Sequence, residues 1–244
     1  MSHRWRRLVL PGLMIVAARS AGAQHNTRAD RVARSPTAAG VNARHSLVAV
    51  RTQRPILIDG RMDADEWRAA SIARDFIQRR PDPGNAARQR SEAAVLYDGD
   101  ALYVGMRLFD TAPDSVAATL ARRDFAGHSD WAHVIVDSYL DRRSAFRFGV
   151  NPAGVRSDGF LSEDSEEMDD PSWDAVWESA ATRDSAGWTA ELRIPLSQLR
   201  FGARPDSAAD NADLAWGIQF VRDIARYGER SLWAPVESDA AGFQ

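Results

Sequence analysis

The 244-residue sequence contains no cysteine and no lysine. Without cysteine the fold has no disulfide, so its stability must come from a buried hydrophobic core. We attribute the absence of lysine to the base composition of the genome rather than to a binding function. Recognisable catalytic motifs are absent too, because the chain has no glycine-rich phosphate loop, no H-E-x-x-H motif and no nucleophile elbow.

Long hydrophobic runs are also missing, and the most apolar stretch lies near the N-terminus. Residues 8–18 are apolar and follow a short segment rich in arginine. The stretch contains Pro11 and is shorter than the about 20 residues that span a bilayer, which argues against a membrane anchor. The small-residue pattern Ala21-Gly22-Ala23 comes next. We therefore predict that residues 1–23 are a signal peptide cleaved after Ala23, and that the protein is exported to the periplasm or the outer membrane.

The charge of the chain is mildly acidic, with a formal net value of −3. Four arginines and no acidic residue fall within residues 1–23, so the exported chain is more acidic than the whole sequence. Nucleic acid is therefore not expected as a partner, because binding its phosphate backbone requires an excess of basic side chains.

Alternation of apolar with polar or small residues is the main structural signal from Ile56 onward. This alternation is typical of half-buried strands, in which every second side chain enters a core. Its clearest runs are Ala101–Leu108, Phe146–Val150, Trp188–Ile194 and Trp216–Phe220. They predict that Val104, Phe148, Leu192 and Ile218 point inward.

Turn signals punctuate these runs, and helix signals are scarce. Asp98-Gly99 between two strand-like runs predicts a hairpin. Asp63–Ala70 predicts a short helix with Asp63 and Glu66 as a capping box and Trp67 filling one end of the fold. A second short helix is predicted near Asp114–Ala121. Many short strands joined by polar turns predict an all-β fold, an antiparallel β-sandwich resembling a jelly roll.

The domain organisation follows from composition. Residues 24–50 are rich in Arg, Ala, Asn and Ser without periodicity, which predicts a flexible leader after the signal peptide. Residues 51–238 form the predicted β-sandwich domain. We expect residues 239–244 to be the truncated start of a longer C-terminal region.

The densest acidic segment runs from Glu163 to Asp170. The simpler interpretation is a solvated loop between strands. The alternative is a structural Ca²⁺ site, because Ca²⁺ binds several converging carboxylate and carbonyl oxygens. The candidate ligands are then Glu163, Asp164, Asp169 and Asp170, although the segment does not match an EF-hand loop. His128 and His133 are five positions apart and do not predict a metal-binding pair.

Two tryptophans and a basic cluster are the candidate ligand-binding residues. Trp173 and Trp177 lie four apart in a strand-like run and so share a face, where they pack in the core or form a platform for a sugar ring. Trp173 is the preferred platform, and Trp177 fits the core better. Arg122-Arg123-Asp124, followed by Asp130, predicts either an internal salt-bridge network or donors for ligand hydroxyls and carboxylates.

Several motifs taken together resemble family 9 carbohydrate-binding modules. They include the opening I-D-G-x-x-D-x-x-W pattern at Ile58–Trp67, the Y-D…L-Y-V-G hairpin at Tyr97–Gly105 and the G-W-T-A-E run at Gly187–Glu191. The chain is also similar to exported bacterial proteins of unknown function in which such a domain precedes an outer-membrane β-barrel-like region. That second resemblance rests on Arg122-Arg123-Asp124, the segment around Asn151-Pro152, and Trp173-Asp174 with Trp177.

The resemblance covers about residues 54–236 and implies a β-sandwich that binds carbohydrate, often beside glycoside hydrolysis. It implies structural Ca²⁺ and a pair of aromatic residues that clamp a sugar, and it adds Asn151 to the candidate ligand-binding residues. The function it favours is an exported, non-catalytic glycan-binding domain linked to carbohydrate catabolism at the cell envelope. One alternative is a domain that docks on an outer-membrane barrel and binds no sugar. Another is a glycosidase-associated domain that contributes catalytic carboxylates.

Overall fold

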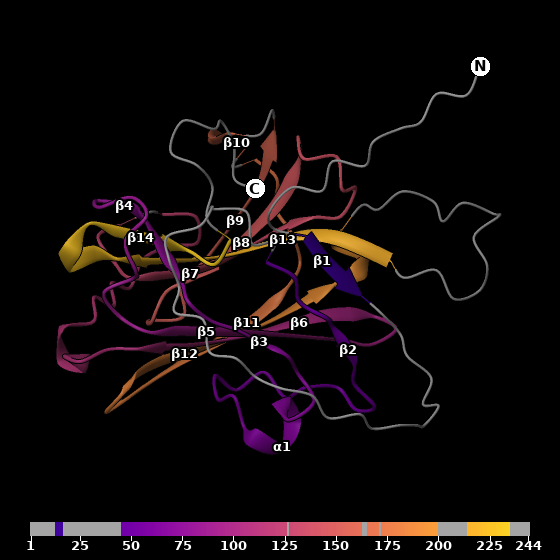
Figure 1. The fold of residues 1–244 in the computed structure, drawn as a ribbon, viewed down its shortest axis with the longest axis horizontal. Coiled ribbons are helices and arrows are strands. Elements are labelled where there is room, and N and C mark those ends of the chain that lie inside the picture. The colour runs from indigo at the N-terminus through magenta and orange to yellow at the C-terminus, as the bar shows by residue number, and fades with distance from the viewer. Residues whose placement is uncertain are drawn as a thin grey trace, which may run out of the picture.

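The computed structural model describes residues 13–16, 45–125, 127–162, 165–170, 172–199 and 214–234. The predicted alternation produces two β-sheets, which Figure 1 shows as stacked layers. Val104, Phe148, Leu192 and Ile218 all point into the core between the sheets, as predicted. The all-β sandwich is confirmed, and its short helices lie in the connections between strands.

The first sheet has eight strands. Its order is β10-β9-β8-β7-β13-β14-β4, with β1 also paired to β13, and every pairing is antiparallel. The strands are β1 (Leu13–Val16), β4 (Ile77–Arg80), β7 (Trp131–Asp137), β8 (Ala145–Val150), β9 (Arg156–Ser162), β10 (Ser165–Asp170), β13 (Leu214–Ile224) and β14 (Glu229–Leu232).

The second sheet has six strands in the order β11-β12-β6-β5-β2, with β3 also paired to β5. The pairing of β2 with β5 is parallel and the others are antiparallel. The strands are β2 (Val50–Arg51), β3 (Ile72–Ala73), β5 (Ser91–Tyr97), β6 (Ala101–Phe109), β11 (Glu178–Asp184) and β12 (Gly187–Pro195).

The helices are short: α1 (Ala64–Trp67) and the 3₁₀ turns η1 (Pro113–Ser115), η2 (Leu196–Gln198) and η3 (Ala225–Tyr227). Within the described residues no helix is long and apolar enough to cross a membrane. The capping-box prediction is wrong, because the Asp63 side chain makes no capping hydrogen bond. Trp67 does not fill an end of the sandwich. It packs on the outer face of the six-stranded sheet against Ala94, Leu96 and Tyr103.

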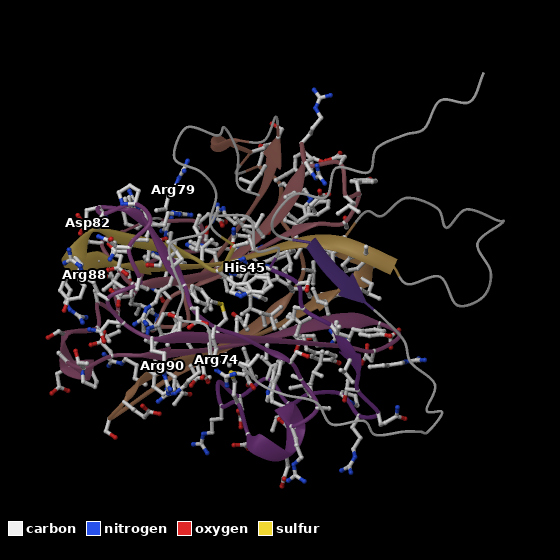
Figure 2. The ribbon with its side chains drawn as sticks, in the orientation of Figure 1. His45, Arg74, Arg79, Asp82, Arg88 and Arg90 are labelled. Atoms are coloured by element: carbon white, nitrogen blue, oxygen red, sulfur yellow. The ribbon has the colours of Figure 1, made fainter. Side chains whose placement is uncertain are left out.

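The end of the predicted leader also differs from expectation. Residues 45–50 are ordered, with Leu47 and Ala49 buried in the main core. Figure 2 shows His45 between the two layers, where its ring meets that of Trp233 edge-on with centroids 5.4 Å apart. The folded domain therefore includes these residues. The composition of residues 24–50 predicted a leader up to residue 50, because the alternating apolar residues Leu47 and Ala49 occupy only a short segment of it.

Candidate functional site

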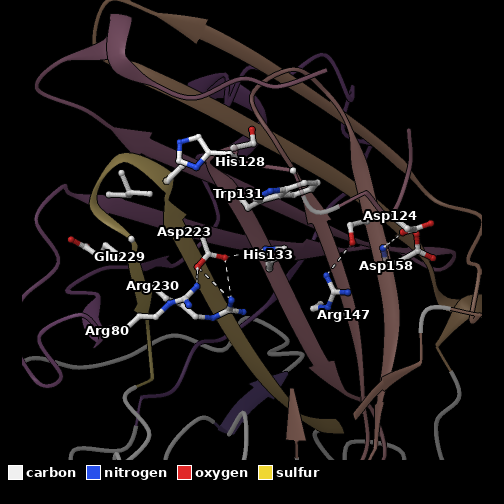
Figure 3. Close-up of a pocket in the computed structure, with 16 residues that line it drawn as sticks. Arg80, Asp124, His128, Trp131, His133, Arg147, Asp158, Asp223, Glu229 and Arg230 are labelled. Carbon is white, nitrogen blue, oxygen red and sulfur yellow. Dashed lines mark hydrogen bonds and ion pairs between the residues drawn. The ribbon is translucent and has the colours of Figure 1, made fainter. Parts of the chain in front are cut away.

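A polar pocket of about 480 Å³ lies on the outer face of the eight-stranded sheet. Neighbouring strands contribute its floor, because residues two apart on a strand share a face. The central side chains are Trp131 and His133 from β7, Arg147 from β8, Asp223 from β13, Arg230 from β14 and Arg80 from β4. The loop that carries Asp124 and His128 forms the rim (Figure 3).

Two stacked rings form the apolar part of the floor. Trp131 and His133 alternate with the buried residues Ala132 and Val134, so both rings face the pocket. Their centroids are 5.6 Å apart and their planes differ by 13°. Gly149 lies opposite His133 on β8, and a Cβ there would meet the Nδ1 atom of His133 at 2.2 Å. Glycine at this position is therefore what lets the imidazole lie flat across the sheet.

Asp223 is the anionic centre of the pocket. One of its carboxylate oxygens lies 3.3 Å from Nε2 of His133 and 3.2 Å from Nη1 of Arg230. The other oxygen lies 3.5 Å from Nη2 of Arg80. Burial alone would raise the pKa of Asp223, but the bond with His133 and the charge of Arg230 outweigh it and lower the pKa. Burial lowers the pKa of His133, so its imidazole is neutral at pH 7.

A second ionic cluster closes the opposite wall. The guanidinium of Arg123 is paired with Asp158 and lies 2.6 Å from Asp174 and 3.6 Å from Asp124. It also donates to the carbonyl of Ala175 at 2.7 Å. Asp124 accepts from the backbone N–H of Asp158 at 3.0 Å. Arg123 and Asp124 of the predicted cluster therefore belong to an internal salt-bridge network, and Asp124 and Asp158 line the pocket.

The remaining predicted ligand-binding residues lie elsewhere. Arg122 is exposed and is not part of the pocket wall. Asp130 is fully buried and accepts from the backbone N–H of Ala225 at 2.9 Å, while burial raises its pKa. Asn151 is buried and holds its own turn together by accepting from the backbone of Ala153 and Val155. Asp130 and Asn151 thus brace loops rather than face a ligand.

The two predicted tryptophans pack against the core between the sheets. Residues 173–177 are a connection before β11, so the expected strand is wrong. The ring of Trp173 packs on Phe146 and Phe148, with centroids 5.0 and 5.7 Å away. Trp177 is buried and meets Phe148 edge-on. Trp177 is therefore a core residue, and Trp173 is a half-buried residue that packs against the core.

Two of the four predicted calcium ligands lie outside the described residues. Glu163 and Asp164 lie outside them, and Asp169 belongs to β10. Asp170 is exposed at the end of β10 and accepts from the backbone N–H and hydroxyl of Ser172. In the part of the chain that the structure describes, no group of three or more His, Asp or Glu side chains could hold a metal ion.

Glu191 on β12 explains the opening motif of the sequence. Its side chain is completely buried under α1 on the outer face of the six-stranded sheet. One carboxylate oxygen accepts from the backbone N–H groups of Asp59, Gly60 and Arg61 at 3.1, 2.9 and 3.2 Å, and the other accepts from Nε1 of Trp67 at 2.9 Å. Burial raises its pKa to about 7. The I-D-G and W elements of the motif thus fasten the N-terminal segment to the sheet.

The sequence contained a signal for the pocket that composition and motif searches missed. Trp131 and His133 are two apart in the run W-A-H-V-I-V-D, so both occupy the face opposite the core residues. The spacing between His128 and His133 was considered only as that of a metal-binding pair. His128 lies on a loop and lines the same pocket as His133. The sequence alone did not predict that Asp223 belongs to the pocket, because Asp223 reaches His133 only through the pairing of β13 with β7.

No protein-family model matches this sequence, and no curated protein matches it. Solved structures do match the fold. A family 9 carbohydrate-binding module from Caldicellulosiruptor kristjanssonii in complex with cellotriose is 16% identical, with a TM-score of 0.50 over 79% of this chain and 85% of that one. The same kind of module in complex with glucose gives a TM-score of 0.51 at 16% identity, over 78% of this chain and 86% of that one.

A presumed carbohydrate-binding protein from Bacteroides uniformis is 10% identical, with a TM-score of 0.57 over 80% of this chain and 92% of that one. The three matches cover most of this chain and most of each solved structure. The chain therefore has the β-sandwich fold of family 9 carbohydrate-binding modules, as the sequence motifs predicted.

Proposed function

We propose that this domain binds a glycan, without turning it over, in the pocket on the outer face of the eight-stranded sheet. The observation that carries the proposal is the stacked Trp131–His133 floor surrounded by arginine donors and carboxylate acceptors. Sugars present apolar C–H faces to aromatic rings and hydroxyls to charged groups, and this pocket offers both. The fold agrees, because two of the similar structures are modules in complex with cellotriose and with glucose.

Binding without turnover is supported by the partners of two acids in the pocket, Asp158 and Asp223. Glycoside hydrolysis needs a protonated carboxyl group and a second carboxylate across the sugar. Asp158 is paired with Arg123, and the low pKa of Asp223 keeps it ionised. Glu191, whose pKa of about 7 would suit a general acid, is buried on the other sheet.

The test is a glycan array followed by calorimetry on the wild type, Trp131→Ala and Trp131→Phe. We expect micromolar to millimolar affinity for the wild type, because stacking and a few hydrogen bonds must offset the cost of association. Trp131→Ala should weaken binding about fivefold or more, since ring stacking is worth about 1 kcal/mol, and Trp131→Phe should retain most of it.

Trp173→Ala is the matched control. Its ring packs in the core, so the variant should melt at a lower temperature and, while folded, bind with wild-type affinity. If Trp173→Ala abolishes binding and Trp131→Ala leaves it intact, the site is elsewhere. If no glycan binds at all, docking on an outer-membrane barrel or another envelope partner becomes the better account. Exposed Leu120, Phe125 and Val176 would be the first residues to examine for it.

We also propose that the protein is exported and supports carbohydrate catabolism at the cell envelope. The arginine-rich start, the apolar run and Ala21-Gly22-Ala23 support export. The proposed cleavage would remove β1, so the exported domain would keep the other seven strands of the first sheet. N-terminal sequencing of protein recovered from the envelope should begin at Gln24, and an intact Met1 would refute cleavage.

Structural Ca²⁺ in the acidic segment 163–170 is a further proposal, supported by the density of carboxylates there. A bound ion stabilises the folded state by mass action, so Ca²⁺ should raise the melting temperature and a chelator should reverse the rise. Identical melting in Ca²⁺ and in chelator would rule the site out.

A further inference from the structure

Gly149 and Gly105 are glycines within strands, one in each sheet, and both face away from the core. Gly149 belongs to β8 and Gly105 to β6, and the residues on either side of each are buried in the core. Glycine weakens a strand interior and often marks a place where another group approaches the backbone closely. A Cβ at Gly105 would meet the Cε atom of Met62 at 2.8 Å and the ring of Trp67 at 3.0 Å. Gly105 thus makes room for the segment that covers its sheet.

At Gly149 the neighbouring group is the imidazole of His133. A Cβ at this position would lie 2.2 Å from Nδ1, 2.7 Å from Cε1 and 3.4 Å from Cγ. Contact with three ring atoms means a clash with the ring itself rather than with the tip of a flexible side chain. The backbone does not require glycine here, because the φ angle of Gly149 is not in the left-handed region. The close approach of His133 is therefore what requires it.

The imidazole has little freedom to move aside. Its Nε2 atom lies 3.3 Å from a carboxylate oxygen of Asp223, and its ring stacks on that of Trp131 with the centroids 5.6 Å apart. The His133 side chain is only 8% exposed. A methyl group at position 149 would therefore push the ring away from Asp223 or out of the stack with Trp131. Either movement would change the orientation of the pocket floor.

We propose that Gly149 is a positioning residue of the binding pocket, which fixes the imidazole of His133, and through it the ring of Trp131, in the orientation on which a sugar stacks. The inference rests on the proposed function of the pocket. Stacking depends on the face that an aromatic ring presents, so a binding site needs its rings held in place by their neighbours. A methyl group at position 149 is then enough to weaken ligand binding while the sandwich still folds. Because Gly149 acts through His133, its effect disappears once the imidazole is removed.

The experiment measures the sugar affinity and the melting temperature of Gly149→Ala in the full chain, with Gly105→Ala as the matched control. The probes are cellotriose and the strongest ligand from the glycan array. Gly149→Ala should weaken binding about fivefold or more, because the sugar loses a correctly oriented ring. Overpacking should lower the melting temperature of both variants. Gly105→Ala should bind like the wild type, since the Met62 and Trp67 side chains that it displaces lie on the other sheet.

A titration of His133 separates positioning from a general loss of stability. Burial lowers the pKa of His133 below its ordinary value of 6.5. In Gly149→Ala the displaced ring is better hydrated, so its pKa should rise toward that ordinary value. In Gly105→Ala the pKa of His133 should stay at the wild-type value. NMR follows the imidazole signals with pH, and the signal missing from His133→Ala identifies His133.

A double variant shows whether Gly149 acts through His133. His133→Ala removes the ring, so adding Gly149→Ala to it should leave the melting temperature unchanged and the affinity within about twofold. The double variant has no ring to displace, so this comparison also holds if Gly149→Ala alone fails to fold.

The outcomes separate the two claims. If Gly149→Ala binds sugar like the wild type, the inference is wrong and glycan binding stands. If the double variant is unfolded, or binds much more weakly than His133→Ala, Gly149 is needed for another reason and the inference is again wrong. If the wild type binds neither cellotriose nor any sugar on the array, the proposed function fails and the inference fails with it.

Discussion

Each outer face of the sandwich holds a carboxylate among hydrogen-bond donors, and the pKa values of these two carboxylates shift in opposite directions. Glu191 on the six-stranded sheet receives four neutral N–H donors from Asp59, Gly60, Arg61 and Trp67. Asp223 on the eight-stranded sheet is surrounded by His133, Arg230 and Arg80. Burial raises the pKa of Glu191 to about 7, whereas the pKa of Asp223 is lowered.

The difference shows how neighbours decide the state of a buried acid. Neutral N–H donors lower a carboxyl pKa, but at Glu191 they do not offset the loss of hydration. Cationic neighbours do offset it at Asp223. Glu191 is sealed beneath the N-terminal segment and α1, where its bonds hold that segment on the sheet, while Asp223 is ionised in a solvent-accessible pocket.

The largest expected effect comes from the core that separates these faces. Leu192 follows Glu191 on β12 and points to the opposite side of the sheet, into the main core. Leu192→Ala should lower the free energy of unfolding by about 2–5 kcal/mol, because it removes buried contacts and leaves a cavity. Chemical denaturation would measure this. A loss below about 1 kcal/mol would show that the faces of β12 are reversed and that Glu191, not Leu192, faces the core.

A smaller effect is expected from Glu191 and depends on pH. Its folded-state pKa of about 7 lies above the ordinary value of 4.5, so folding favours the protonated form. Its contribution to stability is therefore complete below pH 4.5 and is lost as the pH rises to 7, by up to about 3 kcal/mol. Glu191→Gln cannot titrate, so its stability relative to the wild type should improve across this window.

Glu178→Gln is the control for this measurement, since the Glu178 side chain is 64% exposed on the neighbouring strand β11. Its stability should follow the wild type at every pH. If the wild type and Glu191→Gln keep a constant difference from pH 4.5 to 7, the pKa of Glu191 is not raised. The four donors would then hold it as an ordinary carboxylate.

Sequence reasoning predicted the fold well because alternation is a local property. Each alternating run predicted which face of its strand is buried, and strand pairing did not change that face. The buried residues are Val104, Phe148, Leu192 and Ile218. The site was harder to predict because its residues meet only through strand pairing. Asp223 is brought to His133 by the register of β13 against β7. Trp173 was predicted as a sugar platform because it follows a proline at the rim of the fold. The same position is also compatible with packing against Phe146 and Phe148.

The smallest expected effect tests the other carboxylate. The lowered pKa of Asp223 means that its contribution to stability is present above the ordinary value of 3.8 and is lost as the pH falls through the folded-state pKa. Asp223→Asn should cost about 1 kcal/mol at pH 7, because the amide still accepts a hydrogen bond and partial exposure screens the lost charge. The cost should shrink in high salt and disappear at acidic pH, which is the reverse of the trend for Glu191→Gln. A variant that lost stability equally at pH 3 and pH 7 would mean that Asp223 acts through packing alone, and the contrast between the two faces would not hold.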